Sequence, residues 1–384
     1  MTPRVTSILI DGYRPFRQLH MGLGALTVLV GANGTGKSAL LEFLRFLREA
    51  VDREIPPEVI NGASGRQLFH RPGGDEFSWA LNVELGGRFT VTYAGALAGP
   101  VGRPRVVHEV AEALCLGVAA PMLARRDGSG ETRSPTGEEL ISYAILKPGQ
   151  LVLSTVTTPR QPKLYELRET ILGWRFYGAH NINNDRVRRP MPVQQEPVLS
   201  EDCGNLSAVL HFMFTECRDA FDELVFHLRS LVPGLVGLSV KARGAPGEVI
   251  GIWREEGSAE ELTLADLSDG TLRLLCWLAV CLHPKPPTLV CIDEPDQGVH
   301  PRTLPLLAGL LQKATERTQV LVTTHSSYFL LQFPLESIGV LRKADGQVGF
   351  FRPIDSATLM AMLEDFGPEE LERMHRTDEL EILA

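Results

Sequence analysis

The chain has 384 residues, of which 44% are hydrophobic and 22% charged, and its formal net charge is −9. This composition is typical of a globular protein that is long enough for two domains, or for one large domain with an insertion. The negative charge excludes a generally basic, nucleic-acid-binding surface, so any contact with DNA requires a local basic patch. The longest apolar run, residues 274–282, is about half a membrane span and predicts a buried helix. Because the N-terminus lacks the features of a secretion signal, we expect a cytoplasmic protein with no membrane segment.

The first third of the chain predicts strands around a single helix. Strand-like runs occupy residues 6–10, 25–30, 77–85 and 88–93. In the third run, hydrophobic residues alternate with smaller or polar ones, at Phe77, Trp79, Leu81, Val83 and Leu85. The alternation resumes at Phe89, Val91 and Tyr93 after the turn-forming pair Gly86-Gly87, so the last two runs predict an antiparallel hairpin.

The middle of the chain predicts loops and helices. The alternation degrades after Gly95, and residues 125–137 are expected to form a mobile loop. Helices are expected at residues 137–146, 163–174, 205–233 and 367–383, and strand-like patterns return from Leu235. The six cysteines show no CxxC spacing, which predicts reduced core thiols: Cys115, Cys203, Cys217, Cys276, Cys281 and Cys291.

The sequence GANGTGKS, residues 31–38, lies between an apolar strand and a helix. This G-x-x-x-x-G-K-S spacing predicts a phosphate loop, because the glycines let successive N–H groups point at phosphate oxygens and the helix adds its positive dipole end. Lys37 is expected to reach the β- and γ-phosphates, and the Ser38 hydroxyl to bind Mg²⁺. The residues expected to contact the nucleotide are Gly31, Asn33, Gly34, Thr35, Gly36, Lys37, Ser38 and Ala39.

A second apolar strand, residues 289–292, ends in two acids. Adjacent side chains at a strand tip point in different directions. Asp293 is therefore expected to face Mg²⁺ and its waters, while Glu294 faces the water that attacks the γ-phosphate.

A third apolar strand, residues 320–322, is followed by Thr323, Thr324 and His325. If this strand is a parallel neighbour of the previous one, His325 reaches the same sheet edge, where its imidazole can donate to the γ-phosphate or the attacking water. Taken alone, a histidine at a strand end is more often structural. Its spacing from Asp293 favours the catalytic role.

The segment LSDGT, residues 267–271, precedes a helix that is predicted to be buried. Ser268, Asp269 and Gly270 at the start of this helix predict a second anion-binding site. Taken alone, the serine or the aspartate is an ordinary helix cap. In a chain that also carries a nucleotide loop, the segment suggests a contact with the nucleotide of a neighbouring subunit.

With these elements in this order, the chain resembles the ABC-type ATPase heads of the SMC, RecF and Rad50 group, and within it the compact AAA-21 ATPases related to the OLD-family ATPase domain. The resemblance rests on the segments at residues 8–47, 175–190, 267–275, 291–301 and 323–326. It implies an α/β fold of the P-loop NTPase type, with a mixed sheet, an antiparallel β subdomain and an inserted helical lid. Residues 1–95 and 235–384 would form the nucleotide-binding domain, and residues 96–234 a mainly helical lid or arm.

The resemblance further implies a head-to-tail homodimer that closes around two ATP molecules. Ser268 and Gly270 would then touch the γ-phosphate in trans, Glu294 would be the general base, and His325 the switch histidine. Residues 296–300 would communicate across the dimer, although family members often carry Glu where Asp296 stands and Leu where Val299 stands.

Two assignments stay open at this stage. The glutamine that senses Mg²⁺ in relatives could be Gln67, Gln150 or Gln161. Arg14 could approach the nucleotide as comparable arginines do, or it could be a surface arginine.

The biological output follows less directly from the residues. Our first hypothesis is an ATPase whose closed dimer controls a separate effector, such as a nuclease, in DNA repair or in defence against phage. The alternative is an ATP-gated DNA clamp in which slow hydrolysis acts as a timer, whereas a transporter ATPase fits poorly. The clamp would hold DNA phosphates through the arginine cluster, Arg186, Arg188 and Arg189, which could equally be a structural loop that pairs with carboxylates.

Overall fold

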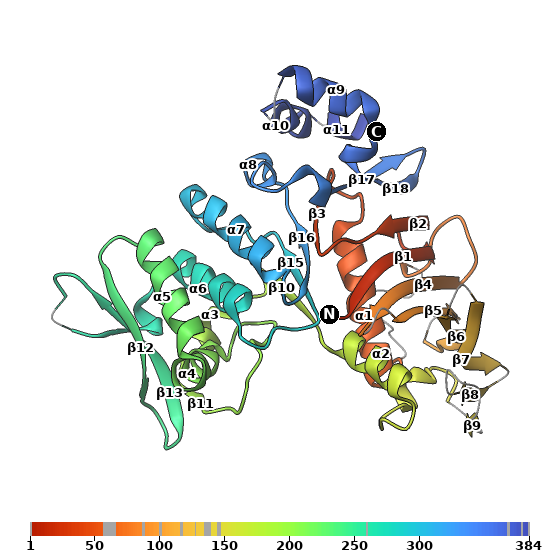
Figure 1. Ribbon diagram of the computed structural model, residues 1–384, viewed down its shortest axis with the longest axis horizontal. Coiled ribbons are helices and arrows are strands. Elements are labelled where there is room, and N and C mark those ends of the chain that lie inside the picture. The colour runs from red at the N-terminus through yellow and green to blue at the C-terminus, as the bar shows by residue number, and fades with distance from the viewer. Residues whose placement is uncertain are drawn as a thin grey trace. The chain divides into compact units, whose positions relative to one another are not determined.

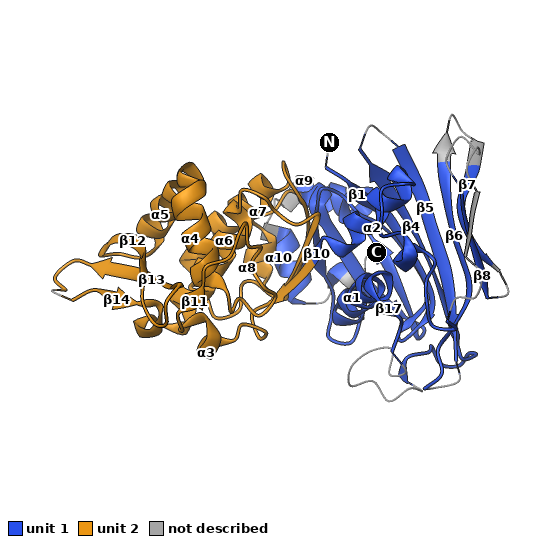
Figure 2. Ribbon diagram, turned by 90° about the horizontal axis from the view of Figure 1, so that it is seen from below, with its two compact units in different colours: residues 1–174, 335–384 blue, residues 175–334 orange. Residues whose placement is uncertain are grey.

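The computed structural model describes residues 2–56, 67–86, 89–99, 102–115, 118–126, 128–133, 140–143, 147–258, 260–366, 369–377 and 379–382. The chain divides into two compact units, residues 1–174 with 335–384 and residues 175–334 (Figure 2). Within the described residues, no helix is long and apolar enough to cross a membrane.

The first unit is built on an antiparallel sheet with strand order β2-β1-β4-β5-β6-β7-β8-β9 (Figure 1). Its strands are β1 (Arg4–Tyr13), β2 (Phe16–Gly22), β4 (Glu76–Leu85), β5 (Phe89–Ala98), β6 (Arg105–Cys115), β7 (Val118–Arg126), β8 (Ser129–Arg133) and β9 (Leu140–Tyr143). Helix α1 (Lys37–Asp52) is joined to the sheet by edge-to-face aromatic pairs: the Tyr13 ring centroid lies 5.4 Å from that of Phe43, and the Phe77 ring centroid lies 5.6 Å from that of Phe46. Helix α2 (Pro162–Leu172) contacts both α1 and β4.

The predicted hairpin is confirmed as β4 and β5, which pair in antiparallel register. Its turn at residues 87–88 lies outside the described residues. Gly95, where the alternation degrades, pairs with Trp79, and a Cβ built at Gly95 would lie 2.5 Å from the indole ring. The glycine that interrupts the sequence pattern therefore makes room for the largest side chain of the neighbouring strand.

A further set of strands in the first unit precedes and flanks the phosphate loop. Strand β3 (Leu26–Val30) is buried along its whole length and pairs in parallel with β17 (Ile338–Ala344), which pairs with β18 (Gln347–Phe351). The C-terminal helices are α9 (Ala357–Phe366), α10 (Glu369–Arg376) and α11 (Glu379–Ile382).

The second unit combines a parallel strand pair with a helical layer and a small antiparallel sheet. Strands β10 (Trp174–Gly178), β15 (Leu289–Asp293) and β16 (Gln319–Thr323) are neighbours in that order, and β15 and β16 are parallel. The small sheet contains β11 (Met191–Pro192), β12 (Leu235–Ala242), β13 (Glu248–Glu255) and β14 (Leu262–Thr263). The helices are α3 (Asn184–Val187), α4 (Leu206–Glu216), α5 (Arg218–Leu231), α6 (Asp269–Leu282), α7 (Leu304–Ala314) and α8 (Ser327–Leu330).

The secondary structure after Gly95 differs from the one that the sequence pattern predicts. Residues expected as a loop at 125–137 contain, in their described part, the end of β7, a turn at Gly128 and strand β8, and residues 140–143 are strand rather than helix. Alternate positions of β6 do face inward, but they are Glu109, Ala111 and Ala113, which carry little hydrophobic signal.

Two further expectations change in detail. The helix predicted at residues 205–233 is two helices, α4 and α5, which meet at Cys217, where the backbone is not helical (φ −136°, ψ 58°). Because strands β6 to β10 lie between residues 96 and 234, this segment is not mainly helical. Its role as an inserted lid stays a prediction.

Five of the six cysteines are free thiols, and all of these but Cys217 are buried. The side chain of Cys115 lies outside the described residues.

Candidate functional site

The phosphate loop, residues 31–38, connects β3 to α1 and turns on three glycines with positive φ. Gly31 has a φ of 150°, Gly34 of 82° and Gly36 of 100°. A Cβ at Gly31 would lie 2.3 Å from the carbonyl oxygen of Leu341, whereas a Cβ at Gly34 would meet nothing within 4 Å. Gly31 is therefore required for close packing on β17, while Gly34 lies where the loop is open to an incoming group.

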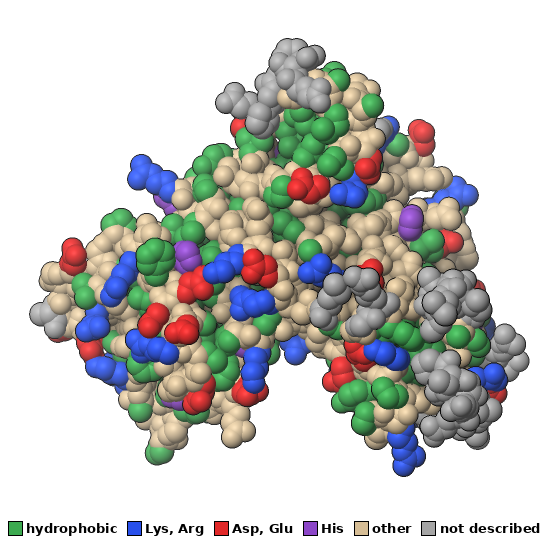
Figure 3. All heavy atoms as spheres, in the orientation of Figure 1, with side chains coloured by type: hydrophobic (Ala, Val, Ile, Leu, Met, Phe, Trp, Pro, Cys, Tyr) green, Lys and Arg blue, Asp and Glu red, His purple; other side chains and the backbone are tan. Residues whose placement is uncertain are grey.

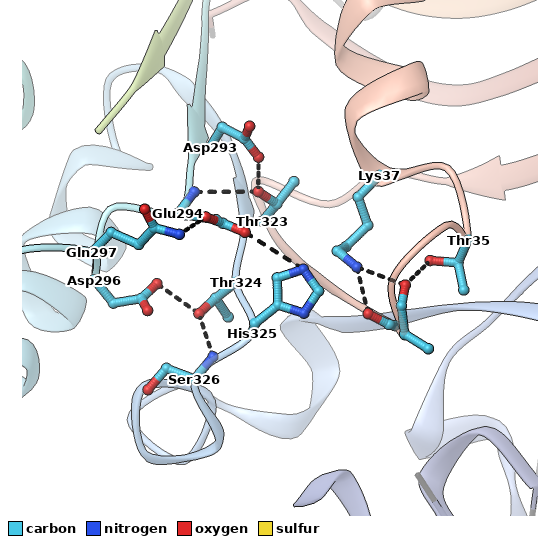
Figure 4. A network of polar contacts seen from close by, with 12 residues as sticks. Thr35, Lys37, Asp293, Glu294, Asp296, Gln297, Thr323, Thr324, His325 and Ser326 are labelled. Carbon is cyan, nitrogen blue, oxygen red and sulfur yellow. Dashed lines mark hydrogen bonds and ion pairs between the residues drawn. The ribbon is translucent and has the colours of Figure 1, made fainter. Parts of the chain in front are cut away.

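Lys37 begins α1, and its side chain is directed back into the loop (Figure 4). Only 7% of the residue is exposed. Its Nζ donates to the carbonyl oxygen of Gly31, and to that of Ala32 at 3.1 Å. The Thr35 hydroxyl donates to the same Ala32 carbonyl at 2.9 Å. The ammonium is thus held by backbone oxygens at the loop, where phosphate oxygens can replace them as acceptors.

Arg14 lies in the turn between β1 and β2 with a left-handed φ of 48°. Its guanidinium forms an ion pair with Glu42 on α1, the helix that follows the phosphate loop. Its backbone N–H donates to the carbonyl oxygen of Leu68 at 2.9 Å. Arg14 therefore links the phosphate-loop helix to the segment around residue 68 and is not an isolated surface arginine.

The three candidate glutamines occupy different surroundings. Gln161 is 3% exposed and donates to the hydroxyl of Thr132, while the carbonyl oxygen of Gln150 accepts a bond from Arg125. Gln67 is exposed and immediately precedes Leu68, the backbone partner of Arg14. Gln67 thus precedes the residue that bonds to the backbone of Arg14.

In the second unit, the two acids lie at the end of β15 beside the end of β16. The parallel register places Asp293 opposite Thr323, whose hydroxyl donates to the Asp293 Oδ1 atom. Glu294 has a left-handed φ of 51°, and its N–H donates to the carbonyl oxygen of Thr323 at 3.0 Å. The two carboxylates point in different directions, as Figure 4 shows.

His325 reaches the same edge because β15 and β16 run in parallel and end together. Its Nε2 atom lies 3.5 Å from the Oε1 atom of Glu294. The other carboxylate oxygen, Oε2, accepts a bond from the side-chain amide of Gln297 (Figure 4). Gln297 belongs to the loop expected to communicate across the dimer, residues 296–300, but the sequence indicated no contact with Glu294, because a glutamine in a turn has no chemical signal of its own. The one hint is its position, three residues after the acid.

Asp296, where relatives often carry Glu, belongs to a neighbouring polar contact. The Thr324 hydroxyl donates to its Oδ1 atom at 2.7 Å and accepts from the N–H of Ser326 at 3.0 Å. Burial raises the pKa of Asp296 above its usual range. The shorter side chain thus ties the loop after Glu294 to the turn that carries His325.

The segment at residues 267–271 forms the start of α6. Ser268 is the N-cap, and its hydroxyl oxygen accepts the N–H of Thr271 at 3.2 Å. Asp269 pairs with Arg188, whose Nη2 lies 2.7 Å from the Asp269 Oδ1 atom. The hydrogen bond from Arg188 lowers the pKa of Asp269. The same Nη2 donates to the carbonyl oxygen of Leu267 at 2.9 Å.

Two members of the arginine cluster are therefore engaged within the unit. Besides the contacts of Arg188, the Nη1 of Arg186 lies 2.5 Å from the Asp202 Oδ2 atom, and Arg189 is exposed. The face drawn in Figure 3 shows basic and acidic side chains interspersed. These contacts favour the hypothesis that the cluster is a structural loop, in which arginines pair with the carboxylates of an acidic chain.

These elements define a P-loop NTPase fold of the SMC-head type. The structure is similar to the crystal structure of an SMC head bound to the C-terminal winged-helix domain of ScpA, with a TM-score of 0.56 and 12% identity over 91% of this chain and 98% of that one. It is also similar to the Smc head with an extended coiled coil, bound to the C-terminal domain of ScpA from Pyrococcus furiosus, with a TM-score of 0.51 and 10% identity over 94% of this chain and 100% of that one. At such identities, the likeness establishes the fold alone.

The family model described as "AAA domain, putative AbiEii toxin, Type IV TA system" matches residues 26–85 and 182–331. The chain belongs to this family of AAA-domain proteins. No curated protein sequence matches the chain. The matched ranges include the phosphate loop, the strand-end acids, His325 and the start of α6.

Proposed function

We propose that the chain binds and hydrolyses ATP. The observation that carries this proposal is the phosphate loop itself, a strand–loop–helix connection on three positive-φ glycines with Lys37 directed into it. Such a loop offers N–H groups and one ammonium to phosphate oxygens. The family match supports a nucleotide as the bound phosphate compound.

Glu294 is the proposed general base, and His325 its proposed partner at the γ-phosphate. Glu294 suits the role because it stands at a strand end, half-exposed, with His325 3.5 Å away. Its left-handed backbone supports this assignment, because such strain is often retained where a side chain must be aimed.

Mg²⁺ is the proposed metal, with Ser38 and Asp293 as its protein partners. Both supply oxygen donors, which suit this hard cation. Ser38 is exposed on the first turn of α1, and the Thr323 hydroxyl binds the Oδ1 atom of Asp293. The metal would supply charge neutralisation of the phosphates. Gln67, linked through Leu68 to Arg14, is the proposed sensor glutamine.

We further propose that ATP closes a head-to-tail homodimer, in which Ser268, Asp269 and Gly270 of one subunit meet the nucleotide of the other. The N-terminal turn of α6 supports this role, since it presents a capped helix start to an anion. Arg188 neutralises Asp269 and so reduces the repulsion that a carboxylate would exert on a γ-phosphate.

The proposed output is control of a separate effector protein, such as a nuclease, in DNA repair or anti-phage defence. The family description names a putative toxin of a type IV toxin–antitoxin system, which supports a defence setting. The SMC heads of similar fold were solved bound to a ScpA domain, which supports a partner protein. An ATP-gated DNA clamp has less support, because Arg186 and Arg188 already pair with carboxylates.

The ATPase proposal is tested with Glu294→Gln, which removes the base but keeps the size of the side chain. We expect ATP binding to be retained, turnover to fall about 10²- to 10⁴-fold, and a closed dimer to accumulate. Turnover is measured as phosphate release, and the dimer by sedimentation velocity. Glu256→Gln, at an exposed glutamate, is the matched control. Wild-type turnover in Glu294→Gln would reject Glu294 as the base.

The effector and clamp models are separated by binding of the purified protein to duplex DNA, with and without ATP, at several salt concentrations. Phosphate contacts weaken steeply as salt rises. The effector model predicts no ATP-dependent binding even at low salt. ATP-dependent, salt-sensitive binding that Arg189→Ala weakens would favour the clamp.

A further inference from the structure

Two side chains contact the carboxylate of Glu294, one at each oxygen. His325 lies at Oε1, and the Gln297 side-chain amide donates to Oε2. The Gln297 N–H also donates to the Glu294 carbonyl oxygen at 3.1 Å, which closes a tight turn after the acid. Gln297 therefore contacts Glu294 through both its backbone and its side chain, and it restricts where the carboxylate can point.

The opposite side of Gln297 faces helix α6. Its carbonyl oxygen accepts a bond from the Arg273 Nη1 at 3.4 Å. The next residue, Gly298, has a φ of 71°, and a Cβ there would lie 1.6 Å from the same Nη1. A Cβ at Gly270 would lie 3.0 Å from the carbonyl oxygen of Gly298. The loop at residues 297–298 is thus packed without spare room against the first turns of α6.

We propose that Gln297 is a positioning residue that orients the Glu294 carboxylate and links it, through Arg273, to the N-terminal turn of α6. This inference rests on the proposed function, in which Glu294 is the base and the start of α6 meets the nucleotide of a second subunit. When α6 engages that nucleotide, its position is transmitted to the loop through Arg273 and the Gly270–Gly298 contact. A shift of this loop moves Gln297, and Gln297 in turn orients the Glu294 carboxylate.

The expected effect follows from the geometry that general-base catalysis requires. A base displaced by about 1 Å from its water loses about a hundredfold in rate. Without the Gln297 donor, Glu294 keeps its His325 contact but gains rotameric freedom. We therefore expect a loss of about tenfold to a hundredfold in kcat, with no loss of affinity for ATP, because Gln297 is not part of the phosphate loop.

The first experiment compares Gln297→Met with wild type. Methionine keeps the length of the side chain but has no N–H to donate, and residue 297 is exposed, so the fold is not at risk. We expect the lower kcat together with unchanged ATP affinity, measured with a fluorescent ATP analogue, and an unchanged ATP-dependent dimer, measured by sedimentation velocity. Gln195→Met, also at an exposed glutamine, is the control and should behave as wild type.

The second experiment tests the link to α6. Arg273→Met should lower kcat by a similar factor, and the double variant should be no slower than either single variant, because both break one connection. Losses that multiply in the double variant would overturn the link. A kcat within about twofold of wild type in Gln297→Met, or a parallel loss of ATP affinity and dimer, would overturn the positioning role.

Glu294→Gln, measured in parallel, separates this inference from the proposed function. If Glu294→Gln turns over normally, the base assignment fails and the inference falls with it. If Glu294→Gln is inactive while Gln297→Met is not impaired, the base assignment stands and the positioning role alone is rejected.

Discussion

Glu294 has a left-handed backbone conformation, with a φ of 51°, which costs a residue with a side chain about 1–2 kcal/mol. Its N–H bond to the carbonyl oxygen of Thr323 and the turn closed by Gln297 hold it there. An unstrained alternative would continue β15 and send the carboxylate elsewhere. At the scale of single residues, the molecule thus accepts local strain where the proposed base must be aimed.

The glycines of the phosphate loop give a paired prediction at the same scale. Gly31→Ala places a Cβ 2.3 Å from the backbone oxygen of Leu341, so we expect a loss of about 3 kcal/mol or more in the free energy of unfolding. Gly34→Ala meets nothing within 4 Å and should lose about 1 kcal/mol, from its positive φ alone. Urea unfolding of both variants measures the difference. Equal losses would contradict the close packing of Gly31 on β17.

At the scale of elements, the start of α6 depends on a residue from a distant loop. Arg188 lies next to α3, yet its guanidinium contacts both the carboxylate of Asp269 and the carbonyl oxygen of Leu267. The arginine cluster therefore shapes the surface that the proposed dimer would use.

Arg188→Ala should accordingly weaken ATP-dependent dimerisation by about fivefold and leave ATP affinity of the monomer unchanged. The reason is that Asp269 is left without its partner beside the proposed γ-phosphate contact. Arg189→Ala, at the exposed neighbour, is the control. Sedimentation velocity with ATP measures the dimer. If both variants behave alike, Arg188 has no special role at α6.

Strand β6 provides a prediction about pH. Glu109 is fully buried, and burial raises its pKa from 4.5 to about 7 although it accepts bonds from the N–H groups of Val152 and Leu153. Between those values, the folded chain binds a proton that the unfolded chain has lost. The free energy of unfolding therefore falls as pH rises through this window and levels off above it.

The Glu109→Gln variant isolates this contribution, because its side chain does not titrate. The wild-type free energy of unfolding, minus that of Glu109→Gln, should fall by about 3 kcal/mol between pH 4.5 and pH 8. Urea unfolding at several pH values gives the difference. A pH-independent difference would show that Glu109 titrates normally in the folded chain.

At the scale of the whole molecule, the proposed homodimer depends on the start of α6. Ser268→Arg puts a long, charged side chain at the N-cap of α6, where the nucleotide of the other subunit would bind. We expect ATP binding by the monomer to persist and ATP-dependent dimerisation to be lost, as measured by light scattering with size-exclusion chromatography. Dimer formation at wild-type ATP concentrations would reject the contact in trans.

Much of the proposed site could be predicted because its signals are local. The phosphate loop and the Asp293–Glu294 pair each follow an apolar strand, and strand, loop and side-chain chemistry are all written within a few neighbouring residues. Strands β6 to β9 could not be predicted, since the inward positions of β6 are Glu109, Ala111 and Ala113. A buried carboxylate depends on donors such as the N–H of Val152, which lie far along the chain.

The sequence by itself determined the nucleotide loop, the acids at the end of β15 and the family, because backbone shape and side-chain type act there over short stretches of chain. Only the tertiary structure decided what surrounds them. It paired Arg188 with Asp269, placed Gln297 on Glu294, and set Arg273 against Gln297. The physical reason is that the two arginine contacts join segments far apart in the chain, while the contact of Gln297 depends on the turn and the rotamer that packing allows. None of these is encoded in a local pattern.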